Sequence, residues 1–224
     1  MELKNPLYKN IGVHVNICIF TVIMGVLKVL LIKKKTEPFF DFWALPGGAL
    51  YNNELVLDAA RRELKEKTGI EIENLFMYNY FDKIDRSPIR RMISIGFMGI
   101  IDSKKVKVLT HTLKTSNADW FDIDNIPLLA YDHNEILDSA IEELKNKIIE
   151  TDILKSFFPD EFTLPELQNV YESILNVKLD RRNFRKKMIN LNIIESVNKE
   201  VIYKGRHPAK LYRFNKDYNK KNVF

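Results

Sequence analysis

One stretch of 23 residues, from Gly48 to Ile70, constrains this chain more than any other segment. Its second half, residues 59–67, contains strong helix formers and neither glycine nor proline, so it predicts a helix. Gly69 follows directly and suits the left-handed residue that ends many helices. A Pro46-Gly47-Gly48 turn precedes the stretch. The sequence therefore predicts a glycine turn, a loop and a helix in fixed order.

The predicted helix carries two carboxylates and one cation on the same face. Glu63 and Glu66 are three residues apart and share that face. Beside the carbonyl groups of a glycine turn, such carboxylates suit Mg²⁺ or Mn²⁺, ions that bridge and neutralise diphosphates. Lys67 opposes a metal there, because one unit charge at about 4 Å is worth roughly 4 kcal/mol at a surface-like dielectric. We expect Lys67 to pair with Glu63 and to take the place of the ion.

The stretch resembles the Nudix box, in which glycine, glutamate, Arg-Glu, a Glu-Glu pair and a final glycine recur at fixed spacing. The matching residues are Gly48, Glu54, Arg62, Glu63, Leu64, Glu66, Gly69 and Ile70. The resemblance implies structural roles for Gly48, Glu54, Arg62 and Gly69, and catalytic and metal-binding roles for Glu63 and Glu66. Lys67 stands where the box has its last glutamate, so we expect a retained pocket with reduced or absent hydrolysis. The alternative is an ordinary charged amphipathic helix, which does not explain the glycines.

Composition indicates a globular protein of a reducing compartment. The chain has 224 residues and a single cysteine, Cys18, which excludes a disulfide framework. The most apolar run, residues 17–32, is 16 residues long and contains Gly25 and Lys28, so it is too short and interrupted to span a membrane. Its alternation predicts a hairpin that turns near Met24-Gly25. We expect a soluble, cytoplasmic protein.

Charge divides the chain into two predicted domains. Residues 1–150 hold 20 Lys and Arg against 21 Asp and Glu, whereas residues 151–224 hold 15 against 9. The acidic, Pro159-containing segment 151–161 is the expected junction. Strands and helices mix irregularly in residues 1–150, which predicts an α+β fold, a Nudix-type α/β/α sandwich, followed by a second domain over residues 151–224.

The second domain has the pattern of a winged helix-turn-helix. Thr163 and Glu166 form a capping box that begins one helix. Asp180 can cap a second helix, where Phe184, Met188 and Leu191 form a buried stripe. Its other face is basic, as in helices that enter the major groove. The candidate DNA contacts are Arg181, Arg182, Asn183, Arg185 and Lys186 on the helix and Lys204 and Arg206 on a basic wing.

Two other interpretations of the basic domain exist. A basic helix face is often only solvated, but here the helix, the wing and the charge segregation agree on DNA. A single-stranded RNA partner is disfavoured, because the domain offers few exposed aromatic residues for stacking.

Nearly the whole chain, from about Val13 to Phe214, resembles the Nudix-related transcriptional regulators. The resemblance is carried by FTLPELQNVYESIL, DRRNFRKKM, GRHPAKLYRF, DRSPIRRMISIGF and YDHNEIL. It implies a homodimer on a palindromic double-stranded operator, with half-sites about 10 bp apart or a multiple of that. It also implies a small effector, ADP-ribose or a related nucleotide or sugar metabolite, as in regulators of NAD or arabinose genes. No cofactor is then required for DNA binding.

The alternative function is a Nudix hydrolase of the ADP-ribose pyrophosphatase type, using Mg²⁺ or Mn²⁺. For the effector, Phe40 and Trp43 are candidates to stack on adenine, and Arg86 and Arg91 are candidates to bind phosphates. Trp43 has an equal claim to a place in the core. His111, His133 and His207 lack partner spacing, so no catalysis is assigned to them, and His133 is expected at a helix start.

Overall fold

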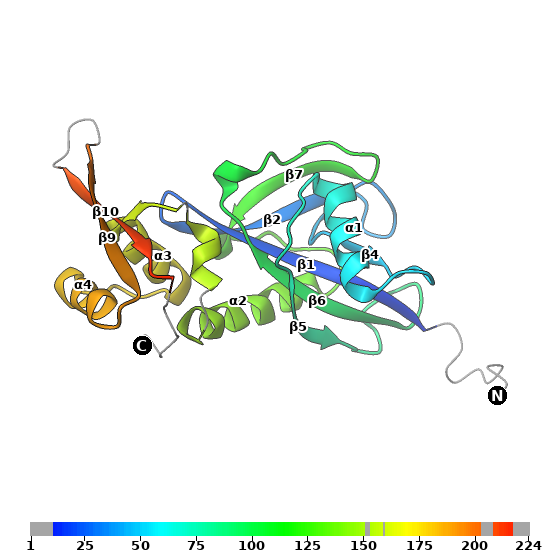
Figure 1. Ribbon diagram of the computed structural model, residues 1–224. Coiled ribbons are helices and arrows are strands. Elements are labelled where there is room, and N and C mark those ends of the chain that lie inside the picture. The colour runs from blue at the N-terminus through cyan, green and yellow to red at the C-terminus, as the bar shows by residue number, and fades with distance from the viewer. Residues whose placement is uncertain (1–10, 151–152, 159, 203–207, 217–224) are drawn as a thin grey trace. The chain divides into compact units, whose positions relative to one another are not determined.

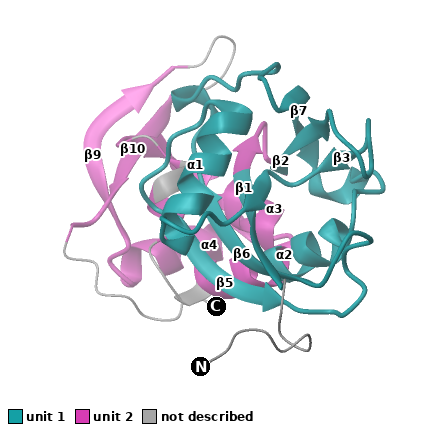
Figure 2. Cartoon of the chain, turned by 90° about the vertical axis from the view of Figure 1, so that its right-hand side faces the viewer, with its two compact units in different colours: residues 1–20, 28–140 teal, residues 21–27, 141–224 magenta. Residues whose placement is uncertain are grey.

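The computed structural model describes residues 11–150, 153–158, 160–202 and 208–216 (Figure 1). The chain divides into two compact units, coloured separately in Figure 2. The first comprises residues 1–20 and 28–140, and the second comprises residues 21–27 and 141–224. The second unit thus includes the tip of a hairpin formed early in the chain. The junction predicted within residues 151–161 stays a prediction, and residues 151, 152 and 159 of that segment lie outside the described residues.

The first unit is built on a mixed seven-stranded sheet. Five strands follow the order β3-β2-β1-β6-β5, while β4 pairs with β1 and β7 pairs with β2. The strands are β1 (Gly12–Ile23), β2 (Val26–Lys34), β3 (Trp43–Ala44), β4 (Gly47–Ala49), β5 (Phe76–Phe81), β6 (Met92–Ile100) and β7 (Thr115–Asp122). Strand β1 is parallel to β6 and antiparallel to β4. It therefore lies inside the sheet, with strands on both of its edges.

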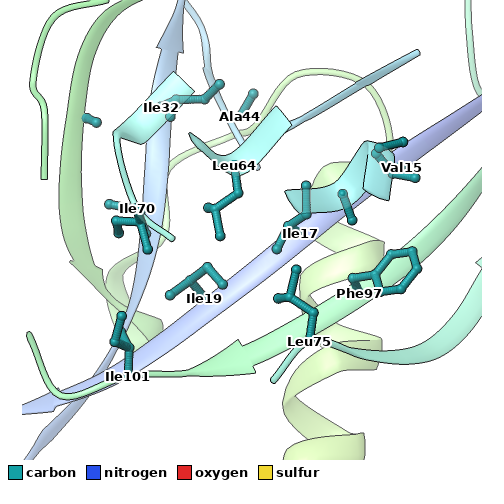
Figure 3. Packing of buried hydrophobic residues seen from close by; sticks show 14 of the residues in the cluster. Val15, Ile17, Ile19, Ile32, Ala44, Leu64, Ile70, Leu75, Phe97 and Ile101 are labelled. Atoms are coloured by element: carbon teal, nitrogen blue, oxygen red, sulfur yellow. The ribbon is translucent and has the colours of Figure 1, made fainter. Parts of the chain in front are cut away.

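The two faces of β1 pack against different helices. Ile17 and Ile19 belong to the core cluster that also contains Leu64 of α1 (Val56–Thr68) (Figure 3). On the opposite face, Asn16 contacts His133, the first residue of α2 (His133–Glu150). This is the two-residue alternation of a strand between two helical layers. The α+β sandwich expected from the sequence is confirmed.

The hairpin between β1 and β2 turns at Met24 and Gly25, as the sequence predicts. Their φ angles are 52° and 80°. A two-residue turn with both φ angles positive suits the twist of a β-hairpin, and glycine adopts it without a steric penalty. The chain can therefore reverse within two residues.

The second unit contains the helices and strands of a winged helix. They are β8 (Phe162–Thr163), α3 (Leu164–Leu175), α4 (Arg181–Asn190), β9 (Ile194–Val201) and β10 (Ala209–Phe214). Among the described residues, a short 3₁₀ helix lies at Ile153–Phe157 in this unit, and two more lie in the first unit at Ser103–Lys105 and Ile123–Asn125. The capping box of Thr163 and Glu166 begins α3, and the Asp180 carboxylate accepts from the Asn183 backbone N–H at the start of α4. Tyr171 and Phe184, with ring centroids 5.5 Å apart, hold α3 against α4.

The three-stranded sheet of this unit has the order β8-β10-β9. Phe162 of β8 and Phe214 of the central strand β10 pack with ring centroids 4.7 Å apart and so join these two strands to one small core. In the part of the chain that the structure describes, no helix is long and apolar enough to cross a membrane.

Candidate functional site

A cavity of about 310 Å³ lies in the first unit, beside the glycine turn and the C-terminal end of α1. Its lining contains four cationic side chains and two histidines but no aspartate or glutamate. These six residues are His14, Lys34, Lys67, Arg86, Arg90 and His133. A cavity with this lining favours an anionic ligand.

The glycines of the turn permit a close approach of β4 to β1 and α1. A Cβ atom on Gly47 would lie 2.3 Å from the carbonyl oxygen of Val15, and one on Gly48 would lie 2.4 Å from Cδ of Glu63. Both separations are too short for any side chain. The turn therefore brings the carbonyl of Gly47 and the carboxylate of Glu63 together at the edge of the cavity.

Lys67 occupies the space between these two acceptors. Its ammonium donates to the carbonyl oxygen of Gly47 and lies 3.4 Å from Oε2 of Glu63. Burial lowers the pKa of Lys67, and the Glu63 carboxylate opposes that shift. Oε1 of Glu63 accepts from Arg62 at 2.5 Å, whereas its buried Oε2 has no hydrogen bond among the described residues. The pairing of Lys67 with Glu63 that the spacing predicts is present.

Arg62 and Glu54 fix the loop between the turn and the helix. Nε and Nη2 of Arg62 donate to the two oxygens of Glu54 at 2.8 and 2.7 Å, and Nη2 also donates to the carbonyl of Ala49 at 2.9 Å. The hydrogen bond from Arg62 lowers the pKa of Glu54 to about 2. Gly69 ends α1 with a φ angle of 73°, as expected of a left-handed cap. All the structural positions of the box thus serve local geometry.

Glu66 is engaged by a lysine that the sequence pattern does not reveal. Its carboxylate accepts from Lys114 at 2.5 Å and lies 3.6 Å from Arg62. The Lys114 hydrogen bond lowers the pKa of Glu66. Lys114 precedes β7 and is brought near α1 by long-range contacts, the pairing of β7 with β2 and the hydrogen bond from the Leu109 N–H to the Thr68 carbonyl at the end of α1. Both carboxylates of the predicted pair therefore face cationic side chains.

Two histidines and an asparagine form a neutral polar wall of the cavity. Nδ1 of His133 accepts from the backbone N–H of Leu45 at 3.0 Å, and its Nε2 is 3.0 Å from the Asn16 amide. Burial lowers the pKa of His133 to about 3 and that of His14 to about 4, with a further contribution from Arg86 in both cases. Both imidazoles are neutral near pH 7. Neutral imidazole and amide groups can form hydrogen bonds with the hydroxyl groups of a ligand.

The structure places the four predicted effector residues in different environments. Arg86 lines the cavity and also forms a bidentate pair with Asp132, both hydrogen bonds being 2.8 Å long. Arg91 instead donates to the backbone carbonyls of Asp82 and Lys83 at 2.6 and 2.8 Å. Its neighbour Arg90 lines the cavity.

The two predicted stacking residues lie elsewhere. Trp43 packs against Phe121, with ring centroids 4.6 Å apart, and Phe40 is 58% exposed. Neither lines the cavity, whereas Tyr131 does. His14 and Asn16, polar residues within an otherwise apolar strand, were the one local sign of this wall in the sequence.

The basic face of α4 is open to solvent. Arg181, Arg182, Asn183, Arg185 and Lys186 are all exposed, while Phe184 and Met188 are buried. The predicted stripe is present at Phe184 and Met188, whereas its third member, Leu191, is only half-buried. Lys204 and Arg206 of the predicted wing lie outside the described residues.

Comparison with known proteins identifies both units. A family model described as NUDIX domain matches residues 12–144, and one described as NrtR DNA-binding winged helix domain matches residues 155–214. The "ADPR responsive transcriptional repressor NtrR" of Acinetobacter baylyi is 33% identical over 204 residues, covering 89% of this chain and 80% of that protein. The chain belongs to the Nudix-related transcriptional regulators.

An enzyme and a solved protein–DNA complex are also similar to this Nudix-related regulator. An ADP-ribose pyrophosphatase of Methanocaldococcus jannaschii is 39% identical over 114 residues, covering 49% of this chain and 63% of that protein. The crystal structure of Shewanella oneidensis NrtR complexed with a 27mer DNA is 24% identical, with a TM-score of 0.75 over 92% of this chain and 94% of that one. The second likeness is one of fold.

Nudix enzymes commonly use divalent metals, so the residues of this box can be tested for a fit to such an ion. The buried, unbonded Oε2 of Glu63 would suit a cation. However, the Lys67 ammonium holds the Gly47 carbonyl and lies between it and that oxygen, and Lys114 and Arg62 engage Glu66. No group of three or more His, Cys, Asp or Glu in the described residues could hold a metal ion. The residues of this box do not fit a divalent metal.

Proposed function

We propose that this chain is an ADP-ribose-responsive transcriptional repressor. Its Nudix domain binds ADP-ribose or a related nucleotide or sugar metabolite, and its winged helix binds double-stranded DNA. The observation that carries the proposal is Lys67, bonded to Gly47 and paired with Glu63 at the wall of a cationic cavity. The curated relative from Acinetobacter baylyi, itself described as ADPR responsive, supports it.

The cavity binds the diphosphate of its effector directly rather than through a metal. Lys34 and Arg90 supply positive charge that no lining carboxylate opposes, and Lys67 adds an ammonium that is also paired with Glu63. Charge-assisted hydrogen bonds from such groups to phosphate are about twice as strong as neutral ones. The neutral wall of His14, Asn16 and His133 offers partners to ribose hydroxyls. Effector binding therefore does not depend on Mg²⁺.

The winged helix contacts DNA through the basic face of α4. Its exposed arginines and lysine neutralise phosphates, and Asn183 lies at the exposed N-terminal end, where base contacts are usually made. One winged helix reads few base pairs, so the protein acts as a homodimer on a palindromic operator. A DNA-binding regulator of this kind works in the cytoplasm.

The competing function is that of an ADP-ribose pyrophosphatase, which the relative from Methanocaldococcus jannaschii favours. In that case Glu63 and Glu66 would be catalytic and would hold the metal. Lys67→Glu separates the two functions, because it restores the carboxylate of the box and removes the ammonium.

The test is calorimetric titration of ADP-ribose into the full chain, with Mg²⁺ and with a chelator, alongside assays for AMP and ribose 5-phosphate, the two products of cleaving its diphosphate bond. We expect wild type to bind equally well in both conditions and to release little product. Lys67→Glu should bind more weakly in chelator and regain affinity or turnover with Mg²⁺. Wild-type binding or brisk turnover that requires Mg²⁺ would establish the enzyme instead.

A further inference from the structure

The β1–β2 hairpin is shared by the cavity and the winged-helix unit. His14 and Asn16 of β1 and Lys34 of β2 line the cavity near the open end of the hairpin. Its tip, residues 21–27, belongs to the second unit, drawn in magenta in Figure 2. Eight residues separate Asn16 from Met24, a span of about 26 Å at the rise of a β-strand. A continuous hydrogen-bonded element therefore leads from the cavity to the second unit.

The tip contacts α3 through one serine. The Ser173 hydroxyl donates to the carbonyl oxygen of Gly25 and also lies 2.7 Å from the carbonyl of Asn169, one helical turn back. A hydroxyl has one proton, so it serves one of these acceptors at a time. Because the helix offers an alternative acceptor, the tip can leave without an unsatisfied donor at Ser173. The contact is therefore easily broken and remade.

Resting on the function proposed above, we propose that this contact is the switch that couples the cavity to DNA. The hairpin tip is docked on α3 through Ser173 in the DNA-binding state, and effector in the cavity favours the undocked state. Docking holds α3, and α3 holds the recognition helix α4 through Tyr171 and Phe184. Fixing α4 in this way reduces the ordering cost of binding DNA.

Weaker docking should change the affinities for operator and for ADP-ribose in opposite directions, whereas damage to the fold would lower both. A ligand shifts a two-state equilibrium only through different affinity for the two states, and the coupling is reciprocal. Ser173→Ala weakens docking by about the fivefold that one net hydrogen bond represents. Operator affinity without effector should fall and ADP-ribose affinity should rise, and the two factors should multiply to about fivefold. Ser139→Ala, which removes a serine hydrogen bond to Asn79 in the other unit, should change neither.

A reversible disulfide tests the docked state directly. A Cβ atom on Gly25 would lie 3.8 Å from Cβ of Asn169, which is about the mean separation in disulfides. The left-handed backbone at position 25 strains a cysteine, so the reduced form of Gly25→Cys/Asn169→Cys is the reference for its oxidised form. Operator binding of the full chain would be measured by fluorescence anisotropy, with and without ADP-ribose, before and after oxidation.

We expect the oxidised variant to bind operator regardless of ADP-ribose and to regain the response on reduction. A response that survives oxidation overturns the switch, as does Ser173→Ala with both affinities unchanged or both reduced. If ADP-ribose does not change operator binding by the wild type, the proposed function itself is refuted. If wild type responds and the variants respond equally, only the role of the hairpin tip is refuted.

Discussion

At the scale of single residues, Lys67 defines what the Nudix domain of this chain does. A carboxylate at its position would add to the negative charge of Glu63, whereas the ammonium neutralises it inside the fold. Glu63 is 3% exposed, so its charge depends on cations supplied by the protein. At this single departure from the box pattern, the ammonium of Lys67 neutralises Glu63 where a metal ion would otherwise do so.

Removing the Lys67 ammonium should lower the free energy of unfolding, because buried Glu63 then loses a cationic partner. Lys67→Met leaves Oε2 of Glu63 without its cationic partner, while Arg62 and Lys114 still face Oε1 at 2.5 and 3.9 Å. Breaking a buried pair costs about 3 kcal/mol of unfolding free energy. Lys65→Met is the matched control on the same helix, because Lys65 and its partner Glu71 are 61% and 71% exposed. Exposed pairs contribute less than about 1 kcal/mol. Equal losses in urea denaturation of the two variants would contradict the buried role of Lys67.

His133 should make the Nudix domain sensitive to acid. Its folded pKa of about 3 lies below the unfolded value of 6.5, so the unfolded state binds more protons between these values. Stability is therefore complete above about pH 6.5 and is lost as the pH falls. Between pH 7 and 4.5 the loss from this residue is on the order of 2 kcal/mol.

The comparison is His133→Gln, which keeps an acceptor for Leu45, against His111→Gln on an exposed loop. Urea midpoints measured across that pH range should depend less steeply on pH in His133→Gln than in wild type. A slope unchanged from wild type would show that His133 is not held neutral by burial.

At the scale of elements, the features that depend on residues close in sequence were predicted, whereas contacts between distant segments were not. Helix α1, its Gly69 cap, the Met24-Gly25 hairpin turn and the capping box of α3 all follow from residues close in sequence. The pairing of β7 with β2 does not, nor does the hydrogen bond from the Leu109 N–H to the Thr68 carbonyl of α1, and these long-range contacts bring Lys114 beside Glu66.

The cavity shows the same division. Arg86 was a candidate from sequence, but Arg90, His14 and Tyr131 were not, because their meeting depends on strand register and on a loop far along the chain. Trp43 could not be assigned in advance, since an aromatic residue beside a turn suits stacking and packing equally. Its contact with Phe121 depends on where β7 lies.

Helix α4 should account for much of the salt dependence of DNA binding. Arg181→Ala/Arg185→Ala removes two exposed cations, and the salt slope falls by about one for each phosphate that is no longer neutralised. We expect weaker operator binding with a slope about two smaller. Lys178→Ala, an exposed lysine outside α4 in the same unit, is the control. Equal salt slopes for wild type and the double variant would remove α4 from the interface.

At the scale of the whole molecule, the two units have distinct chemistry. The Nudix domain gathers cations inward around a cavity, whereas the winged helix presents them outward on α4. One cationic arrangement suits a small enclosed anion and the other suits an extended polyanion. A regulator requires both, with the occupancy of the first altering the affinity of the second.

The most direct test of this account is operator affinity as a function of ADP-ribose. Duplex DNA from the region upstream of the protein's own gene would be titrated with full-length protein in chelator, at fixed salt, with increasing ADP-ribose. We expect operator affinity to fall by about 5- to 150-fold, the usual range of allosteric coupling, and then to level off as ADP-ribose saturates the protein. An operator affinity that stays constant up to saturating ADP-ribose would contradict it.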